Sequence, residues 1–163
     1  MHSIISSHNK NLLQQSNDAE TQKPCNCTRN PCPVDGECRR TAVIYKATVT
    51  ADGTEKQYIG CSESEFKTRW NNHKSSFKHE IYGDKTRLSQ HVWKLKNENV
   101  NYEIKWEIQR KSKPYVNGSR KCDLCLCEKM EILCSDPNVI LNKRREITSN
   151  CRHRAKFKLA NLK

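Results

Sequence analysis

Arg69 and His73 are side chains whose types and spacing suit chemistry on a phosphate. They are four residues apart in a predicted helix, so both rise from one helix face about one turn apart. A guanidinium donates to phosphate oxygens, and an imidazole takes or gives a proton near neutral pH, which together suit phosphodiester hydrolysis. Such pairs also occur by accident on helix surfaces, so the spacing alone leaves both interpretations open.

Two tyrosines fall at similar depths in a predicted β-hairpin. If the turn lies at Asp52-Gly53, Tyr45 and Tyr58 occupy roughly matching positions on the two strands. Their hydroxyls would then flank the same phosphate. The alternative interpretation is that both are ordinary strand aromatics, which are common in sheets.

The ten cysteines are clustered in a way that favours metal ligation. Cys122-x-x-Cys125 offers two thiolates, and Cys151-x-His153 adds a thiolate and an imidazole, which completes a tetrahedral set suited to structural zinc. A second zinc site is predicted upstream, and the ligands of the two groups could also mix. Its candidate ligands are Cys27, Cys32 and Cys38, with Cys25. We expect the remaining Cys61, Cys127 and Cys134 to be small buried side chains.

The chain is strongly basic, with a net charge of +12 and a pI near 9.3, which favours a polyanionic partner. No apolar run approaches the roughly 18 residues that a membrane span needs, so DNA or RNA is favoured over a membrane. Residues 143–163 hold eight Lys or Arg residues and one Glu, which predicts either a phosphate-contacting surface or a solvated terminal helix. The predicted contact residues are Lys143, Arg144, Arg145, Arg152, Arg154, Lys156 and Lys158.

Residues 1–24 are rich in Ser, Asn and Gln and lack an apolar signal core. We therefore expect a disordered lead-in or linker, and an intracellular location for the protein. Disulfides do not persist in a reducing compartment, which strengthens the metal interpretation of the cysteines. Residues 25–41, rich in Cys, Pro and Gly, are predicted to form a small metal-bound knuckle.

From residue 42 onwards the pattern predicts an α/β (α+β) domain that extends to residue 163. Three strands are expected at 43–49, 56–61 and 102–108. Ser62 with Glu65 matches a capping box that opens a helix ending before Gly83. Further helices are expected at 86–97 and from near 122 to Asp136-Pro137, followed by a short extended piece at 139–141 and a basic terminal helix.

The ordered combination of these residues resembles the GIY-YIG nucleases. The matching elements are Val43-Ile44-Tyr45, Tyr58-Ile59-Gly60, Arg69 with His73, Glu128 and Asn142, although Val43 stands where the first motif has Gly. Within this group, the chain most resembles the endonucleases of Penelope-like retroelements, and this resemblance covers residues 27–157. It rests on Cys32-Pro33 to Cys38, Leu88-Ser89 through His91 and Trp93 to Leu95-Lys96, Cys122 to Cys125 ahead of Glu128-Lys129, and Leu141-Asn142 to Cys151-Arg152-His153.

The resemblance implies a DNA endonuclease with a small, mostly antiparallel three-stranded sheet flanked by helices. It implies a Mg²⁺ or Mn²⁺ ion held largely by Glu128, with Glu131 as the alternative ligand. Tyr45 or His73 would help to deprotonate the attacking water, Tyr58 would hydrogen-bond at the phosphate or nucleophile, and Arg69 would stabilise the charge. Asn142 would support the architecture of the site.

In the family that the chain resembles, the cut leaves a 3′-hydroxyl that an attached reverse transcriptase extends. The resemblance therefore implies a fused polymerase, the element RNA and DNA as partners, and a nuclear location. Two alternatives remain at this point: a catalytically inactive, zinc-containing nucleic-acid-binding module, and a repair or restriction nuclease of the same fold. The cysteine pattern disfavours the second.

Overall fold

A two-stranded hairpin forms the centre of the structure. In the computed structural model, which describes residues 24–28, 31–116, 122–143 and 151, β1 (Val43–Ala51) pairs with β2 (Thr54–Ser62) along its whole length. The two-residue turn has positive φ at Asp52 (47°) and Gly53 (73°), the geometry that such a hairpin turn requires. The predicted turn is confirmed, and β2 extends beyond the predicted strand at both ends.

The third strand, β3 (Tyr102–Lys111), pairs antiparallel with β1 and gives the strand order β2-β1-β3. The predicted alternation is confirmed. Tyr102, Ile104, Trp106 and Ile108 pack against the main core, and the alternate residues Glu103, Lys105 and Glu107 are exposed. The sheet is antiparallel throughout, and β2 is one of its edges.

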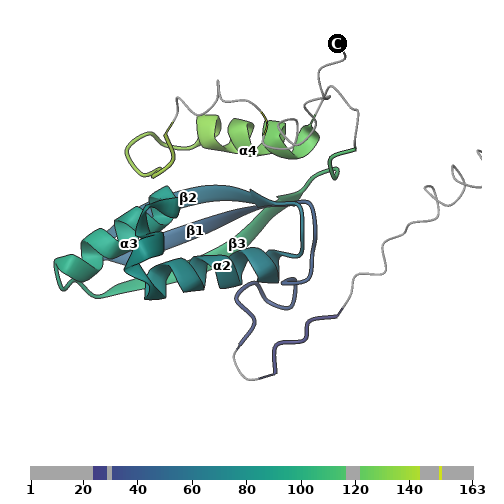
Figure 1. Cartoon of the computed structure of the whole chain (residues 1–163). Coiled ribbons are helices and arrows are strands. Elements are labelled where there is room, and N and C mark those ends of the chain that lie inside the picture. Colours follow the sequence, from purple (N-terminus) through teal and green to yellow (C-terminus); the bar gives the residue numbers. More distant parts are fainter. Residues whose placement is uncertain (1–23, 29–30, 117–121, 144–150, 152–163) are drawn as a thin grey trace, which may run out of the picture.

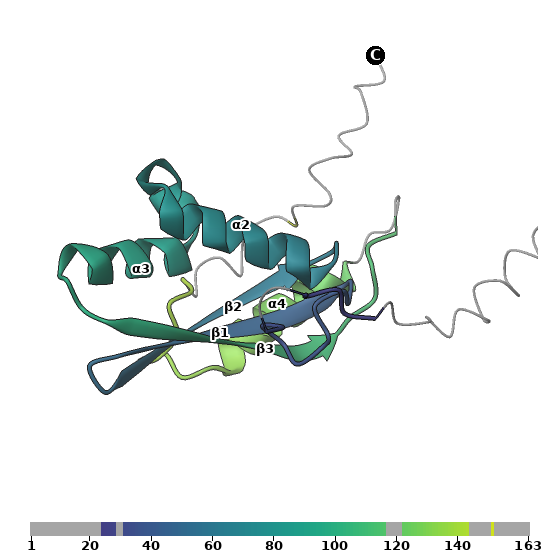
Figure 2. The same cartoon turned by 90° about the horizontal axis from the view of Figure 1, so that it is seen from below.

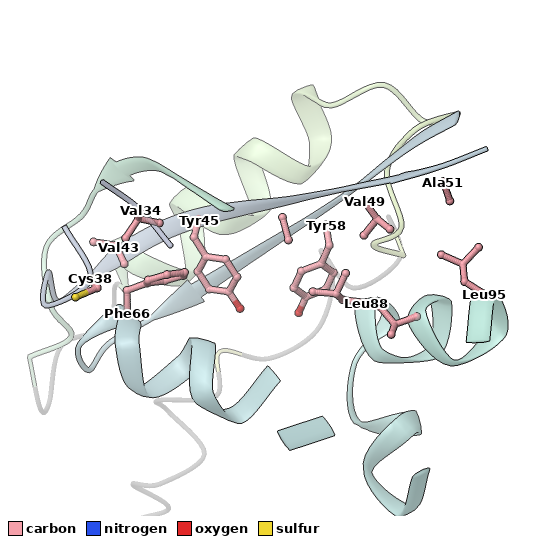
Figure 3. Packing of buried hydrophobic residues seen from close by; sticks show 12 residues of the cluster. Val34, Cys38, Val43, Tyr45, Val49, Ala51, Tyr58, Phe66, Leu88 and Leu95 are labelled. Atoms are coloured by element: carbon pink, nitrogen blue, oxygen red, sulfur yellow. The ribbon is translucent and has the colours of Figure 1, made fainter. Parts of the chain in front are cut away.

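Helices cover both faces of the sheet. The helices α2 (Phe66–Lys78) and α3 (Arg87–Asn97), joined by the 3-10 helix η1 (Glu80–Lys85), lie on one face, and α4 (Asp123–Cys134) lies on the other (Figures 1 and 2). The main core fills the space between the sheet and the first two helices (Figure 3). A smaller core around Ile44, Ile59, Leu124 and Ile132 joins α4 to the hairpin. Within the described ranges, no helix has the length and apolar character of a membrane span.

The start of α2 differs from the sequence prediction. Ser62 is the last residue of β2, and Glu65 forms no side-chain hydrogen bond at the helix start, so the predicted capping box is wrong. The carbonyl oxygens of Arg40 and Cys38 instead accept hydrogen bonds from the amides of Phe66 (2.9 Å) and Lys67 (2.7 Å). The cysteine-rich segment thus satisfies the backbone donors that a helix start leaves open.

A hydrogen-bond network fixes α2 against α3. The hydroxyl of Ser76 donates to the carbonyl oxygen of His73 (2.7 Å) and shares a hydrogen bond with Ser89 (2.8 Å). The indole of Trp93 donates to the carbonyl oxygen of Ser76 (2.9 Å). These contacts fix the helical turn that carries His73, because both helices bond to the same backbone segment.

Helix α4 packs against the sheet with a face that the spacing of its apolar residues does not predict. Leu124, Cys125 and Ile132 are buried, whereas the regularly spaced Leu126, Met130 and Leu133 are exposed. Beyond this helix, the amide of Gln57 donates to Val139 and the amide of Leu141 donates to Gln57, with a parallel bridge between Gln57 and Ile140. The expected extended piece therefore adds to the edge of β2. The terminal helix expected after it lies outside the described residues.

Candidate active site and metal centres

Tyr45 and Tyr58 lie side by side on neighbouring strands, with both hydroxyls directed towards the helical layer (Figure 3). Their ring centroids are 6.5 Å apart, and both residues are buried. Tyr45 passes over Gly60, its partner in the strand register, since a Cβ atom at Gly60 would lie 2.4 Å from the Tyr45 hydroxyl. Glycine at position 60 is therefore what allows the phenol of Tyr45 to reach across β2.

Tyr45 connects the two predicted catalytic side chains of α2. The Nε of Arg69 donates to the Tyr45 hydroxyl (3.1 Å), and this hydroxyl lies 2.8 Å from Nε2 of His73. An arginine can only donate, so the Tyr45 oxygen accepts from Arg69, and in the His73 tautomer that carries its proton on Nδ1 the Tyr45 hydroxyl donates to Nε2. The structure thus brings Arg69, Tyr45 and His73 into one directed hydrogen-bond chain, with Tyr58 against the His73 ring at a centroid distance of 5.8 Å.

Burial sets the protonation states in this chain. Burial, followed by the charge of Arg69, lowers the pKa of His73 to about 3, so the imidazole is neutral at physiological pH. Burial chiefly raises the pKa of Tyr45 well above its usual value, so this phenol stays protonated. Burial lowers the pKa of Arg69, but the neighbouring phenols raise it by more, so the guanidinium remains cationic.

The neutral state of His73 predicts a stability loss in acid. The unfolded chain binds the proton below the ordinary pKa of 6.5, whereas the folded chain resists it down to about 3, so stability is complete above pH 6.5 and falls below it. The slope approaches about 1.4 kcal/mol per pH unit. Between pH 6.5 and 5, urea unfolding should show wild type losing about 2 kcal/mol more than His73→Asn. All other titrating groups are the same in both proteins, so an equal loss in the two would contradict the assignment.

Glu128 reaches the site from the opposite layer. It lies on α4, half buried, and among the described residues it forms no hydrogen bond or salt bridge. Its carboxylate is near enough to Tyr45 to add, after burial and Tyr58, to the raised pKa of that phenol. Glu131, the alternative ligand, instead pairs with Arg110 at 3.4 Å.

Glu128 belongs to no group of three or more potential metal ligands among the described residues. Among the described residues, the groups of three or more side chains placed to share a metal consist of cysteines only. Mg²⁺ commonly binds to one or two carboxylates and completes its shell with water and substrate phosphate oxygens. The partly buried, unpaired carboxylate of Glu128 fits that mode of binding.

Asn142 bonds to the backbone of β2 next to Tyr58. Its side-chain oxygen accepts from the amide of Ile59, and its side-chain nitrogen donates to the carbonyl oxygen of Ile59, both at 2.8 Å. The side chain is buried, so these two bonds fasten the segment after α4 to β2 between Tyr58 and Gly60. Asn142 therefore positions the strand that carries Tyr58.

The N-terminal cysteines form a compact group. The sulfur atoms of Cys25, Cys27, Cys32 and Cys38 all lie within 4.8 Å of one another, with Cys25 and Cys27 at 3.5 and 3.7 Å from Cys38. Four thiolates at about 2.3 Å from a zinc ion would be about 3.8 Å apart, which matches these spacings. This group could hold a zinc ion.

Without a cation, Cys25 and Cys38 of this group differ strongly in acidity. The amide of Cys27, followed by Cys38, lowers the pKa of Cys25 to about 7, whereas burial raises the pKa of Cys38 to about 12. A bound zinc ion would offset part of the negative charge and hold all four as thiolates.

A second cysteine group comprises Cys122, Cys125 and Cys151, whose sulfur atoms also lie within 4.8 Å of one another. This group could also hold a zinc ion. Its predicted fourth ligand, His153, lies outside the described residues. The two groups keep separate ligands, so the structure shows no mixing between them among the described cysteines.

Cys61 lies against the second cysteine group, a position that the sequence did not predict. This thiol bonds to Cys125 and, ahead of burial, raises the pKa of Cys125. Cys61 and Cys127 are partly buried, but Cys134 is exposed, so its predicted burial is wrong. The contact between Cys61 and Cys125 follows from α4 packing over β2, which local spacing does not encode.

The predicted phosphate-contacting residues of the basic segment are described only in part. Lys143 is exposed. Arg144, Arg145, Arg152, Arg154, Lys156 and Lys158 lie outside the described residues.

Comparisons with protein families, with curated proteins and with solved structures found no match to this chain.

Proposed function

We propose that this protein is a divalent-metal-dependent DNA endonuclease of the GIY-YIG type. The observation that carries the proposal is the hydrogen-bond chain from Arg69 through Tyr45 to His73 beside the unpaired carboxylate of Glu128. The two elements belong to opposite layers, but β2 between them is an edge strand. Because Glu128 lies close enough to Tyr45 to act on its hydroxyl, a phosphate bound beside Tyr45 would contact both elements.

The directed chain supplies a route for a proton. The Tyr45 oxygen accepts from Arg69 and donates to His73, which leaves it able to accept from an attacking water. As the water oxygen bonds to phosphorus, its proton moves to Tyr45 while the Tyr45 proton moves to Nε2 of His73, and the P–O3′ bond breaks to release the 3′-oxygen, which takes a proton from solvent. A bound anionic phosphate offsets the charge of Arg69, one of the two causes of the low pKa of His73.

Arg69 and Tyr58 interact with the oxygens of the reacting phosphate. The cationic guanidinium stabilises negative charge that builds up on the phosphate oxygens, and the Tyr58 hydroxyl donates to the phosphate or to the attacking water. Mg²⁺ or Mn²⁺ at Glu128, when bound, supplies charge neutralisation and stabilises the leaving oxygen. Asn142 and the cysteine groups act structurally, because they hold β2 and the start of α2 in place.

The wider role follows the resemblance to Penelope-like elements. The cut leaves a 3′-hydroxyl for a fused reverse transcriptase, which uses the element RNA as template during insertion in the nucleus. The net charge of +12 supports DNA as the partner. The two cysteine groups could hold zinc, which would be a structural metal distinct from the hard cation at Glu128.

Relaxation of supercoiled plasmid tests this function. The zinc-loaded protein should convert supercoiled plasmid to nicked or linear DNA with Mg²⁺ or Mn²⁺ and should leave it intact with neither. A DNA polymerase should extend the new ends, because they carry 3′-hydroxyls. A protein that binds the plasmid without cutting it under any of these conditions would instead be the inactive binding module.

A further inference from the structure

A cavity of about 490 Å³ opens between α2 and η1, next to the Arg69–Tyr45–His73 chain. Its lining includes Arg69, Asn72 and Ser75 from α2, Tyr82 and Lys85 from η1, and Thr86. Its volume lies within the range of roughly 300–1,000 Å³ that is usual for ligand sites.

The lining of this cavity suits an anion. It contains two cationic side chains, Arg69 and Lys85, several hydroxyl and amide groups, and no carboxylate. A second cavity between η1 and α3 has the opposite character, since Glu80, Asp84 and Glu98 line it with Lys94. The acidic residues of η1 therefore face away from the first cavity.

Lys85 lines the cavity beside the ring of Tyr82. Its ammonium lies 4.8 Å from the centroid of the Tyr82 ring, and no carboxylate pairs with it within the described part of the chain. The 3-10 helix itself is anchored against α3, because a Cβ atom at Gly83 would lie 2.9 Å from Trp93. Lys85 thus adds a positive charge to the cavity lining that no carboxylate of the described residues neutralises.

We propose that this cavity binds a second phosphodiester of the substrate DNA strand, adjacent to the one that is cut. This inference rests on the proposed function. Arg69 lines the cavity and also bonds to Tyr45, so it lies between the two phosphate positions. Lys85 and the polar groups of α2 neutralise and orient the neighbouring phosphate, which sets the strand relative to the catalytic residues.

Salt-dependent binding of a fluorescein-labelled DNA duplex, with Ca²⁺ replacing Mg²⁺, tests the proposal. Lys85→Gln should reduce the slope of log affinity against log salt by about 0.9, the value for one phosphate contact, and lower affinity about five- to tenfold at 0.1 M salt. Lys105→Gln is the matched control, because it removes one charge from an exposed site on β3 outside the cavity. Asn72→Asp, which adds a negative charge to the lining, should also weaken binding.

The outcomes separate the subsite from the nuclease proposal. Equal slopes for Lys85→Gln and wild type, or an equal loss in Lys105→Gln, would overturn the subsite while leaving cutting by the wild type unaffected. A wild-type protein that never cuts, but whose binding depends on Lys85 and not on Lys105, would retain the subsite and overturn the nuclease. With both proposals correct, Lys85→Gln should raise KM and leave kcat nearly unchanged.

Discussion

Replacing Arg69 with Ala is expected to lower kcat for plasmid cutting by about 100- to 1,000-fold, the usual effect of removing one preorganised donor to a developing charge. Arg69 both donates to Tyr45 and carries the cationic charge nearest to the hydrogen-bond chain. Loss of Arg69 removes the charge that stabilises the phosphate oxygens. It also removes the hydrogen bond that orients the Tyr45 hydroxyl towards His73. Single-turnover cutting with saturating protein measures this effect.

The Arg69→Lys variant sharpens this prediction, because lysine keeps the charge but lacks the guanidinium fork that bonds to Tyr45. It should restore DNA affinity and recover only a small part of the rate. Thermal stability and zinc content monitor folding in both variants. Cutting by Arg69→Ala within about threefold of wild type would remove Arg69 from the mechanism.

Replacing Cys38 with Ser is expected to release one zinc ion per chain, lower stability by at least about 3 kcal/mol and reduce cutting at least tenfold. Structural zinc contributes more binding free energy than most small domains have as net stability. The sulfur of Cys38 is fully buried within the four-cysteine group, and its carbonyl oxygen caps α2. Loss of zinc therefore frees the segment that holds the start of the helix carrying Arg69 and His73.

Cys134→Ser is the matched control for Cys38→Ser, because Cys134 is exposed and belongs to neither cysteine group. It should keep its zinc, its melting temperature and its activity. Zinc is measured by elemental analysis, and unfolding by the near-ultraviolet signal of the tryptophans. A Cys38→Ser protein that retains full zinc content would show that the N-terminal group is not a zinc site.

Local sequence signals predicted most of the secondary structure. The Asp52-Gly53 turn fixed the hairpin, and the alternation from Tyr102 to Ile108 identified β3, because both signals act between near neighbours. The start of α2 was misassigned, since its caps come from Arg40 and Cys38, far from the capping-box positions. The buried face of α4 was also hidden, because that helix has little amphipathic character and packs through Leu124 and Ile132.

The candidate site was predictable to a similar extent. The spacing of Arg69 and His73 placed both on one helical face, and the structure joins them through Tyr45. Spacing left Glu128 and Glu131 as alternatives, and the tertiary contacts separate them, because Glu128 lies near Tyr45 whereas Glu131 pairs with Arg110. The cavity beside Lys85 gave no sequence signal, since it depends on how η1 folds back between two helices.

The most direct test of the central claim compares Glu128→Gln with Glu131→Gln in metal-dependent plasmid cutting. Both changes remove one negative charge from the same helix and keep the side-chain size. We expect Glu128→Gln to cut at least about 1,000-fold more slowly, equivalent to about 4 kcal/mol of activation free energy, with unchanged zinc content and DNA affinity. Glu131→Gln should remain within about threefold of wild type. Equal cutting by the two variants would contradict a catalytic cation at Glu128.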